Sequence, residues 1–153
     1  MPKNIKREGF MKRLIFGLLI VLTLCGCSDI VFANTIDSDK AIKSIIGEGE
    51  DQGKIGMTAL GEAIRNRGTL KGVYGYRAII EKNGKFYRKS KKGLRAISSS
   101  IVKQAEQAWK DSSRSNYVHG ANHWENVKAF GMPDWAIDME KTFEYKDHMF
   151  FRS

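Results

Sequence analysis

The chain has few cysteines, and their scarcity excludes disulfide bonds and thiol catalysis from most of it. Only two of its 153 residues are cysteine, Cys25 and Cys27, and none follows residue 27. A domain built from the remaining residues has no disulfide, so core packing alone must stabilise it. Thiol catalysis is excluded there for the same reason. The sequence also lacks a P-loop, a dinucleotide-binding fingerprint, a nucleophile elbow and zinc-finger spacing.

Long hydrophobic runs are equally scarce. The one such run, from Leu14 to Leu24, has eleven residues, whereas a transmembrane helix needs about 20. The run follows the basic Met11-Lys12-Arg13, so it predicts the hydrophobic region of a secretory signal. We therefore expect a signal peptide over residues 1–27, a short linker over 28–38 and a single domain over 39–153.

Two sites compete as the end of this signal. Leu24-Cys25-Gly26-Cys27 resembles a bacterial lipobox, in which Cys27 carries the lipid, whereas Val31-Phe32-Ala33 predicts ordinary cleavage after Ala33. The plainest alternative is that both cysteines are only apolar residues of the signal. We favour the lipobox because a Gly-Cys pair directly closes the hydrophobic region. The expected location is the periplasm or cell envelope, with a lipid anchor that makes the membrane a partner.

Positive charge is in excess. The formal net charge is +9, and +5 of it remains beyond residue 27, because residues 1–27 hold five basic residues and one acidic residue. A basic exported protein suits an anionic partner such as a cell-wall polymer or a membrane surface, and export argues against nucleic acid. Much of the excess lies in the run from Arg88 to Lys92. Its simplest interpretation is a solvated loop, and contact with wall polymer is the alternative.

Apolar periodicity predicts two consecutive helices at the start of the domain. A first helix, capped by Ser38 or Asp39, is expected to end at Gly47 and Gly49. A second helix is expected from Asp51 to a C-capping Gly68. The apolar faces of these two helices consist of Ala41, Ile42, Ile45 and Ile46, and of Ile55, Ala59, Leu60, Ala63 and Ile64.

The later segments give weaker signals. Asn83-Gly84 predicts the turn of a small β-hairpin or basic loop. Helical spacing returns from Ile97 to Trp109, and Pro133 can open a short helix to about Lys141. The last part of the chain is otherwise expected to be irregular and rich in aromatic side chains.

Carboxylates are the main candidates for chemistry. Glu48 directly follows the apolar Ile45-Ile46 pair, so it can be drawn onto the core surface. Burial raises the pKa of a carboxyl group, which then keeps a proton to donate to a glycosidic oxygen. Glu50 and Asp51 are most simply a solvated acidic turn, and Glu62 is most simply an exposed partner of Arg65 or Asn66.

Histidines are the second group of candidates. His119 and His123 are four residues apart, which on a helix would place both on one face for a metal ion. Gly120 lies between them, however, and no glutamate occupies the position of a general base. We therefore predict no metal and no cofactor, and we expect these histidines to be structural or to contact substrate.

Four motifs, in order, resemble the SleB/CwlJ-type cell wall hydrolase family. The first runs from Ser44 to Arg67, with Glu48 at the family's Gly-Glu-Ala and with Asn66-Arg67 at its close. The other three are Gly120-Ala121-Asn122-His123-Trp124-Glu125-Asn126, Pro133-Asp134-Trp135-Ala136 and Asp147-His148-Met149-Phe150-Phe151. Gly49 stands where the family has Ala, and the basic insertion over 81–95 has no counterpart in it.

The resemblance implies a lysozyme-like, mainly α-helical domain of the α+β class that cleaves the glycan strands of peptidoglycan. Glu48 matches the family's catalytic glutamate. In a lytic transglycosylase this residue first donates a proton and then accepts one from the sugar's own 6-hydroxyl group. A hydrolysing muramidase needs a second carboxylate at about 5 Å or about 6.5–9.5 Å, for which Glu62 and Glu50 are candidates. The absence of an obvious partner favours the transglycosylase. The expected sugar-binding residues are Asn122, His123, Trp124 and Trp135.

Two other classes of function stay open. One is an N-acetylmuramoyl-L-alanine amidase, which cuts the peptide stem and normally needs zinc. The other is a non-catalytic basic lipoprotein that binds the wall or the membrane.

Overall fold

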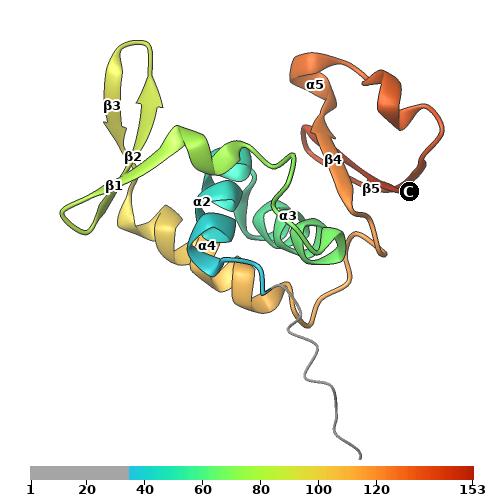
Figure 1. Cartoon of the computed structure of the whole chain (residues 1–153), viewed down its shortest axis with the longest axis horizontal. Helices are drawn as coiled ribbons and strands as arrows, with labels where there is room; N and C mark the ends of the chain where they lie inside the picture. The colour runs from blue at the N-terminus through green and yellow to red at the C-terminus, as the bar shows by residue number, and fades with distance from the viewer. Residues whose placement is uncertain (1–34) are drawn as a thin grey trace, which may run out of the picture. The chain divides into compact units, whose positions relative to one another are not determined.

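The computed structural model describes residues 35–153 (Figure 1). The predicted signal over 1–27, the lipid site Cys27 and the alternative cleavage after Ala33 lie outside these residues. Within 35–153, no helix combines the length and the apolar character that crossing a membrane requires. The principal elements are α2 (Ser38–Gly49), α3 (Gly53–Arg67), η1 (Gly75–Ala78), β1 (Ile79–Lys82), β2 (Lys85–Ser90), β3 (Gly93–Ala96), α4 (Ser99–Asp111), β4 (His123–Asn126), α5 (Val127–Phe130), η2 (Asp134–Ala136), β5 (Glu140–Tyr145) and β6 (His148–Arg152).

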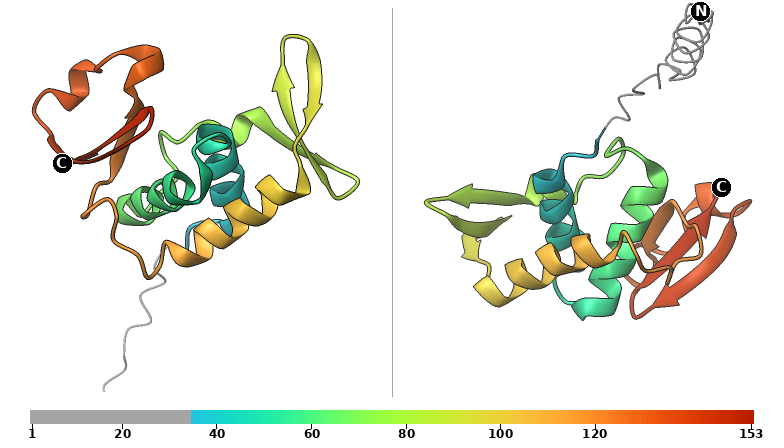
Figure 2. Two further views of the ribbon diagram at one scale, coloured as in Figure 1. Left: turned by 180° about the vertical axis from the view of Figure 1, so that it is seen from behind. Right: turned by 90° about the horizontal axis from the view of Figure 1, so that it is seen from below.

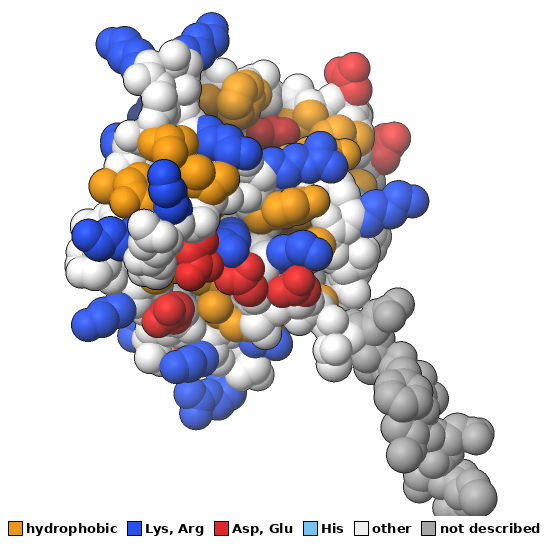
Figure 3. Space-filling view, turned by 60° about the vertical axis from the view of Figure 1, so that its left-hand side comes forward, with side chains coloured by type: hydrophobic (Ala, Val, Ile, Leu, Met, Phe, Trp, Pro, Cys, Tyr) orange, Lys and Arg blue, Asp and Glu red, His pale blue; other side chains and the backbone are white. Residues whose placement is uncertain are grey.

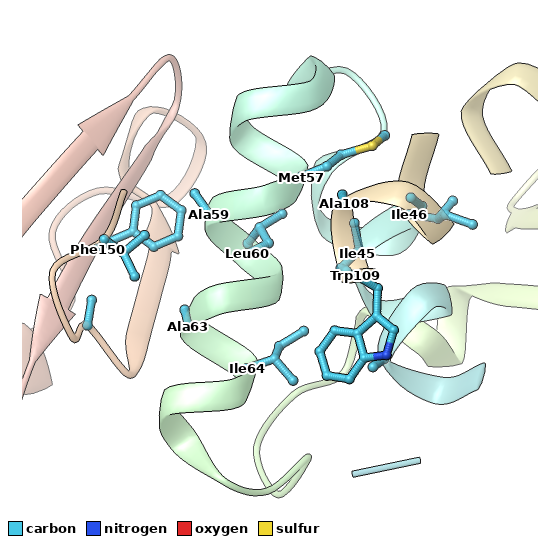
Figure 4. Packing of buried hydrophobic residues seen from close by; sticks show 14 of the residues in the cluster. Ile45, Ile46, Met57, Ala59, Leu60, Ala63, Ile64, Ala108, Trp109 and Phe150 are labelled. Atoms are coloured by element: carbon cyan, nitrogen blue, oxygen red, sulfur yellow. The ribbon is translucent and has the colours of Figure 1, made fainter. Parts of the chain in front are cut away.

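The central helix α3 packs on two sides, and this places it in the middle of the core. All residues from Gly56 to Ile64 are buried. In Figure 4, Leu60 and Ile64 point toward α2 and Trp109 of α4, whereas Ala59 and Ala63 lie toward Phe150 of β6. These four residues of α3 confirm the predicted apolar face. Ile55 is instead 39% exposed, because it lies in the first turn, before the helix enters the core.

The helix ends follow local side-chain chemistry. The first helix is capped by Asp37, whose carboxylate accepts a hydrogen bond from the backbone N–H of Lys40, so the predicted caps Ser38 and Asp39 were wrong by one or two residues. Gly68 has φ = 70° and closes α3, as predicted. Ser98 caps α4, so Ile97 precedes that helix rather than beginning it.

The first sheet is antiparallel, with strand order β1-β2-β3. Asn83 and Gly84 form the two-residue turn between β1 and β2, with φ of 51° and 68°, which confirms the predicted hairpin. The third strand was not predicted. It pairs Arg95 with Arg88 of the central strand, so the basic segment is an ordered sheet rather than a loop.

The second sheet, with order β4-β6-β5, contradicts the expectation of an irregular C-terminal part. The short helix expected from Pro133 to Lys141 is only the 3-10 turn η2, because β5 already begins at Glu140. Figures 1 and 2 show the two sheets on opposite sides of the helices. The α+β class is confirmed, with one more sheet than the sequence predicts.

The first helix ends at Gly49, the second of the two glycines that were expected to close it. Glu48 therefore lies in the last turn of α2. Gly47 is needed for packing, since a Cβ there would overlap the backbone carbonyl of Gly75. The helix therefore presses directly against the backbone of η1 at the position next to Glu48.

Gly47→Ala is expected to lower the free energy of unfolding by about 1–3 kcal/mol, because the methyl group meets a backbone that cannot turn aside. The sign of the change is diagnostic, because the same substitution in an uncrowded helix stabilises by up to about 1 kcal/mol. Urea unfolding followed by circular dichroism measures the change. An unfolding free energy equal to or above that of the wild type would contradict the proposed contact.

Candidate active site

A cleft of about 550 Å³ lies at the end of α2. Residues from both sheets and two helices line it, so it forms only when the domain is folded. The lining residues are Gly47, Glu48, Glu50, Asp51, Arg88, Arg95, Ile101 and Asn126. Figure 3 shows a face of the domain on which acidic and basic side chains lie next to one another, with hydrophobic side chains between them.

Glu48 is the half-buried carboxyl group of this cleft. Burial raises its pKa above the ordinary glutamate value, and a hydrogen bond from the backbone of Gly75 opposes this effect. The negative charge of Glu125 raises the pKa further, and the positive charge of Arg88 lowers it. The net direction is upward, so Glu48 holds its proton at a higher pH than a solvated glutamate does.

The close approach of η1 produces this burial. A Cβ at position 75 would lie 2.7 Å from both Cγ and Oε1 of Glu48 and 2.8 Å from the Ser44 carbonyl oxygen. Only glycine therefore leaves room for the carboxyl group. Because α2 supplies the glutamate and η1 covers it, the two elements together determine the environment of Glu48.

Glu50 is held by two arginines, so its interpretation as a solvated residue was wrong. Arg95 binds both of its carboxylate oxygens, at 2.8 and 2.6 Å, and Arg88 Nε binds Oε2 at 2.9 Å. Hydrogen bonds from Arg95 are the main cause that holds the pKa of Glu50 below its ordinary value, with Arg88 adding to them and burial opposing them. Glu50 is therefore an ionised structural partner of the first sheet.

Glu62 is buried inside the core, so its predicted role as an exposed partner was also wrong. Only 3% of the residue is exposed, and Oε2 accepts a hydrogen bond from the backbone N–H of Val118 at 2.9 Å. This bond ties α3 to the loop that precedes β4. Among the described residues, the cleft lining does not include Glu62.

Asp51 and Asn126 complete the polar lining. Asp51 is exposed, as expected for a turn, and its Oδ1 accepts a hydrogen bond from Gln52 Nε2 at 2.8 Å. Asn126 ends β4 opposite the buried His148 of β6, and its Oδ1 accepts a hydrogen bond from the backbone of Ala129. The sequence prediction placed neither Asn126 nor Arg88 in the candidate site, although Asn126 is the last residue of the second motif.

The four predicted sugar-binding residues lie on or beside the second sheet. Asn122 Oδ1 lies 2.7 Å from His123 Nδ1, and the rings of His123 and Trp135 are 5.6 Å apart. Trp135 is 42% exposed, whereas Trp124 packs against the core. Within 35–153, this sheet contributes Asn126 to the cleft and none of these four residues.

Two sequence motifs meet through one hydrogen bond. Asn66 Nδ2, at the close of the first motif, donates to the Ala121 carbonyl oxygen at 2.9 Å. Asn126 and His148 then join the second motif to the last one through the β4–β6 pairing. The segments that were recognised separately along the chain are therefore in direct contact in the folded domain.

The histidines are not arranged as a helical pair. His119 lies in a turn with φ = 47°, and His123 begins β4. In the part of the chain that the structure describes, no three His, Cys, Asp or Glu side chains are grouped so as to hold a metal ion.

A search of solved structures finds the crystal structure of the catalytic domain of the Bacillus cereus SleB protein. The two chains are 14% identical, the superposition covers 75% of this chain and 88% of that one, and the TM-score is 0.48. No protein-family model matches the chain, and no curated protein matches it.

Glu62→Ala is expected to lower the free energy of unfolding by about 1–3 kcal/mol, because the buried N–H of Val118 loses its acceptor. Glu106→Ala is the control, since Glu106 is exposed on α4, and its effect should stay within about 0.5 kcal/mol. Chemical denaturation of both variants measures the difference. Equal stabilities would show that the Glu62–Val118 bond contributes nothing.

Proposed function

We propose that this domain cleaves the glycan strands of peptidoglycan, with Glu48 as the general acid. The observation that carries the proposal is a half-buried glutamate, with its pKa raised by burial, in an open polar cleft. The ordered motifs that resemble the SleB/CwlJ-type family support it, because the first two supply residues to this cleft and the last pairs with the second through His148 and Asn126. The net positive charge of the chain also suits an anionic wall polymer.

The first step is protonation of the oxygen between two sugars. Glu48 donates its proton to this oxygen as the bond to the anomeric carbon breaks, and the leaving sugar departs with a neutral hydroxyl group. A solvated glutamate is already ionised near neutral pH and has no proton to give. The raised pKa of Glu48 enlarges the fraction of protein that carries the proton.

The second step distinguishes a transglycosylase from a hydrolase, and we propose the transglycosylase. Of the two partner carboxylates considered from sequence, Glu50 is already bound to two arginines and Glu62 is buried elsewhere. A transglycosylase needs no second carboxylate. Ionised Glu48 takes the proton of the sugar's 6-hydroxyl group while that oxygen bonds to the anomeric carbon, which forms a 1,6-anhydro end without consuming water.

We propose that sugar rings bind beside the second sheet. Trp135 is exposed and its ring lies 5.6 Å from the ring of the half-buried His123, so a sugar ring can stack there, with Asn122 beside it. Trp124 is the weakest of the four candidates, because it packs against the core. We also propose that the protein is exported and acts at the cell envelope, where a lipid on Cys27 would hold it at the membrane.

Glu48→Gln is expected to lower glycan cleavage by at least about 100-fold, because glutamine cannot donate the proton. Release of soluble muropeptides from purified peptidoglycan measures the rate, and Glu106→Gln is the matched surface control. Circular dichroism should show the same fold for both variants. The assignment of Glu48 would be refuted by a variant that digests peptidoglycan as fast as the wild type.

Mass spectrometry of the released muropeptides should find 1,6-anhydro ends, which weigh one water less than reducing ends. Reducing ends alone would identify a hydrolase and would direct attention to Asp51 and Glu125. Free stem peptides together with sensitivity to a chelator would identify an amidase. Binding to sacculi without any soluble product would identify a non-catalytic wall-binding protein.

A further inference from the structure

Arg88 makes the most extensive polar contact at the cleft. Its Nη2 donates to the Ile46 carbonyl oxygen at 2.8 Å and its Nη1 to the Gly47 carbonyl oxygen at 3.1 Å. Its Nε donates to Glu50 Oε2 at 2.9 Å. One guanidinium group therefore binds residues on both sides of Glu48 in the sequence.

These contacts satisfy a general need of helix ends. The last carbonyl groups of a helix have no partner within that helix, and side chains or water must satisfy them. At the end of α2 a side chain from a different element does so. The positive charge also lies at the negative end of the helix dipole, where it is favourable.

The element that supplies Arg88 is well anchored. The residue lies in the central strand of the first sheet, paired with Ile79 of β1 on one side and with Arg95 of β3 on the other. Its side chain is 25% exposed and that of Glu50 is 19% exposed, so solvent screens this ion pair less than a surface pair. A second arginine, Arg95, holds Glu50 from the third strand.

We infer that Arg88 is the positioning residue for Glu48: from β2 it holds the last turn of α2 and so fixes where the Glu48 carboxyl group lies in the cleft. This inference rests on the proposed role of Glu48 as the acid. It also assigns a purpose to the basic segment over 81–95, because that segment brings an arginine to the helix end. Arg88 itself acts through Glu48 rather than on the substrate.

The charges that face Glu48 determine what removal of Arg88 does to proton donation. Arg88 approaches from β2 and Glu125 belongs to β4, while Glu50, Asp51 and Arg95 line the same cleft. The backbone of Gly75 in η1 covers the carboxyl group. Arg88 is the cation that lowers the pKa of Glu48, against burial and against Glu125. Without it, the pKa of Glu48 rises further.

The geometry requires arginine rather than lysine. Three acceptors in different directions are met by three nitrogens of one planar group. A lysine keeps the charge but has a single nitrogen, so it cannot reproduce this fork. Arg88→Lys and Arg88→Gln therefore separate the effect of position from the effect of charge. Lys89→Gln is the matched control, because Lys89 is the exposed neighbour of Arg88 on the same strand.

The test measures the pH dependence of cleavage in the wild type and the three variants. The acid must be protonated, so kcat/KM falls as pH rises through the pKa of Glu48. Arg88→Gln should lower kcat about 10- to 100-fold through misplacement and should move this fall to higher pH. Arg88→Lys should lower kcat by a similar factor with a smaller movement of the fall. Lys89→Gln should match the wild type in both.

A second measurement does not depend on turnover. Carbon-13 NMR of the glutamate carboxyl groups, with Glu48 assigned by its loss in Glu48→Gln, follows the protonation of Glu48 in the protein without substrate. An upward shift of its pKa in Arg88→Gln, but not in Lys89→Gln, shows that Arg88 acts on Glu48 in the folded protein, whether or not the wild type cleaves glycan. If Arg88→Gln does not fold, the cleavage rate and the Glu48 titration of Arg88→Lys test the inference instead.

Two outcomes would overturn the inference. One is wild-type cleavage and an unchanged Glu48 titration in both Arg88 variants. The other is a cleavage rate that falls only as far as thermal stability falls, while the pH profile and the Glu48 titration stay as in the wild type. That result would make Arg88 a structural residue only. A wild type that cleaves no glycan, but whose Glu48 titration responds to Arg88, refutes the proposed function and leaves the Arg88–Glu48 coupling standing.

Discussion

The packing of α2 directly against the backbone of η1 is the constraint on which the candidate site depends. Two glycines face each other there, because a side chain at Gly47 would overlap Gly75 and a side chain at Gly75 would displace Glu48. This contact removes the Glu48 carboxyl group from water, while the cleft keeps it accessible from the other side. The Glu48 carboxyl group is partly buried and still accessible from the cleft, because the backbone of η1 rather than a side chain covers it.

The parts of the fold that follow local rules could be predicted from the sequence. Regular apolar spacing identified the faces of α2 and α3, and Asn83-Gly84 identified the hairpin turn. The second sheet could not be found in this way. Its turn between β5 and β6 places Lys146, rather than glycine or asparagine, at φ = 52°. Both Phe150 and Phe151 are buried, so β6 lacks the alternation of a strand with one exposed face.

The candidate site was predictable only in part, for a similar reason. Glu48 stood out because two isoleucines precede it. Arg88 was grouped with the charged residues that follow it, yet strand alternation places it on the same face as Phe86, which packs against the core. The partner of Arg88 lies 38 residues earlier in the chain. No local sequence pattern predicts such a long-range contact. The two-residue spacing from Phe86 does indicate that Arg88 is the basic residue of this segment that faces inward.

The two walls of the cleft belong to separate sheets, β1–β3 and β4–β6, and the end of α2 lies between them. Each wall carries its own loop, over residues 91–92 in the first sheet and over residues 131–139 in the second. Neither loop pairs with a strand of the other sheet, so a change in the length of one loop acts first on its own side of the cleft. Evolution can therefore change one side of the cleft at a time, while Glu48 keeps its position between the two walls.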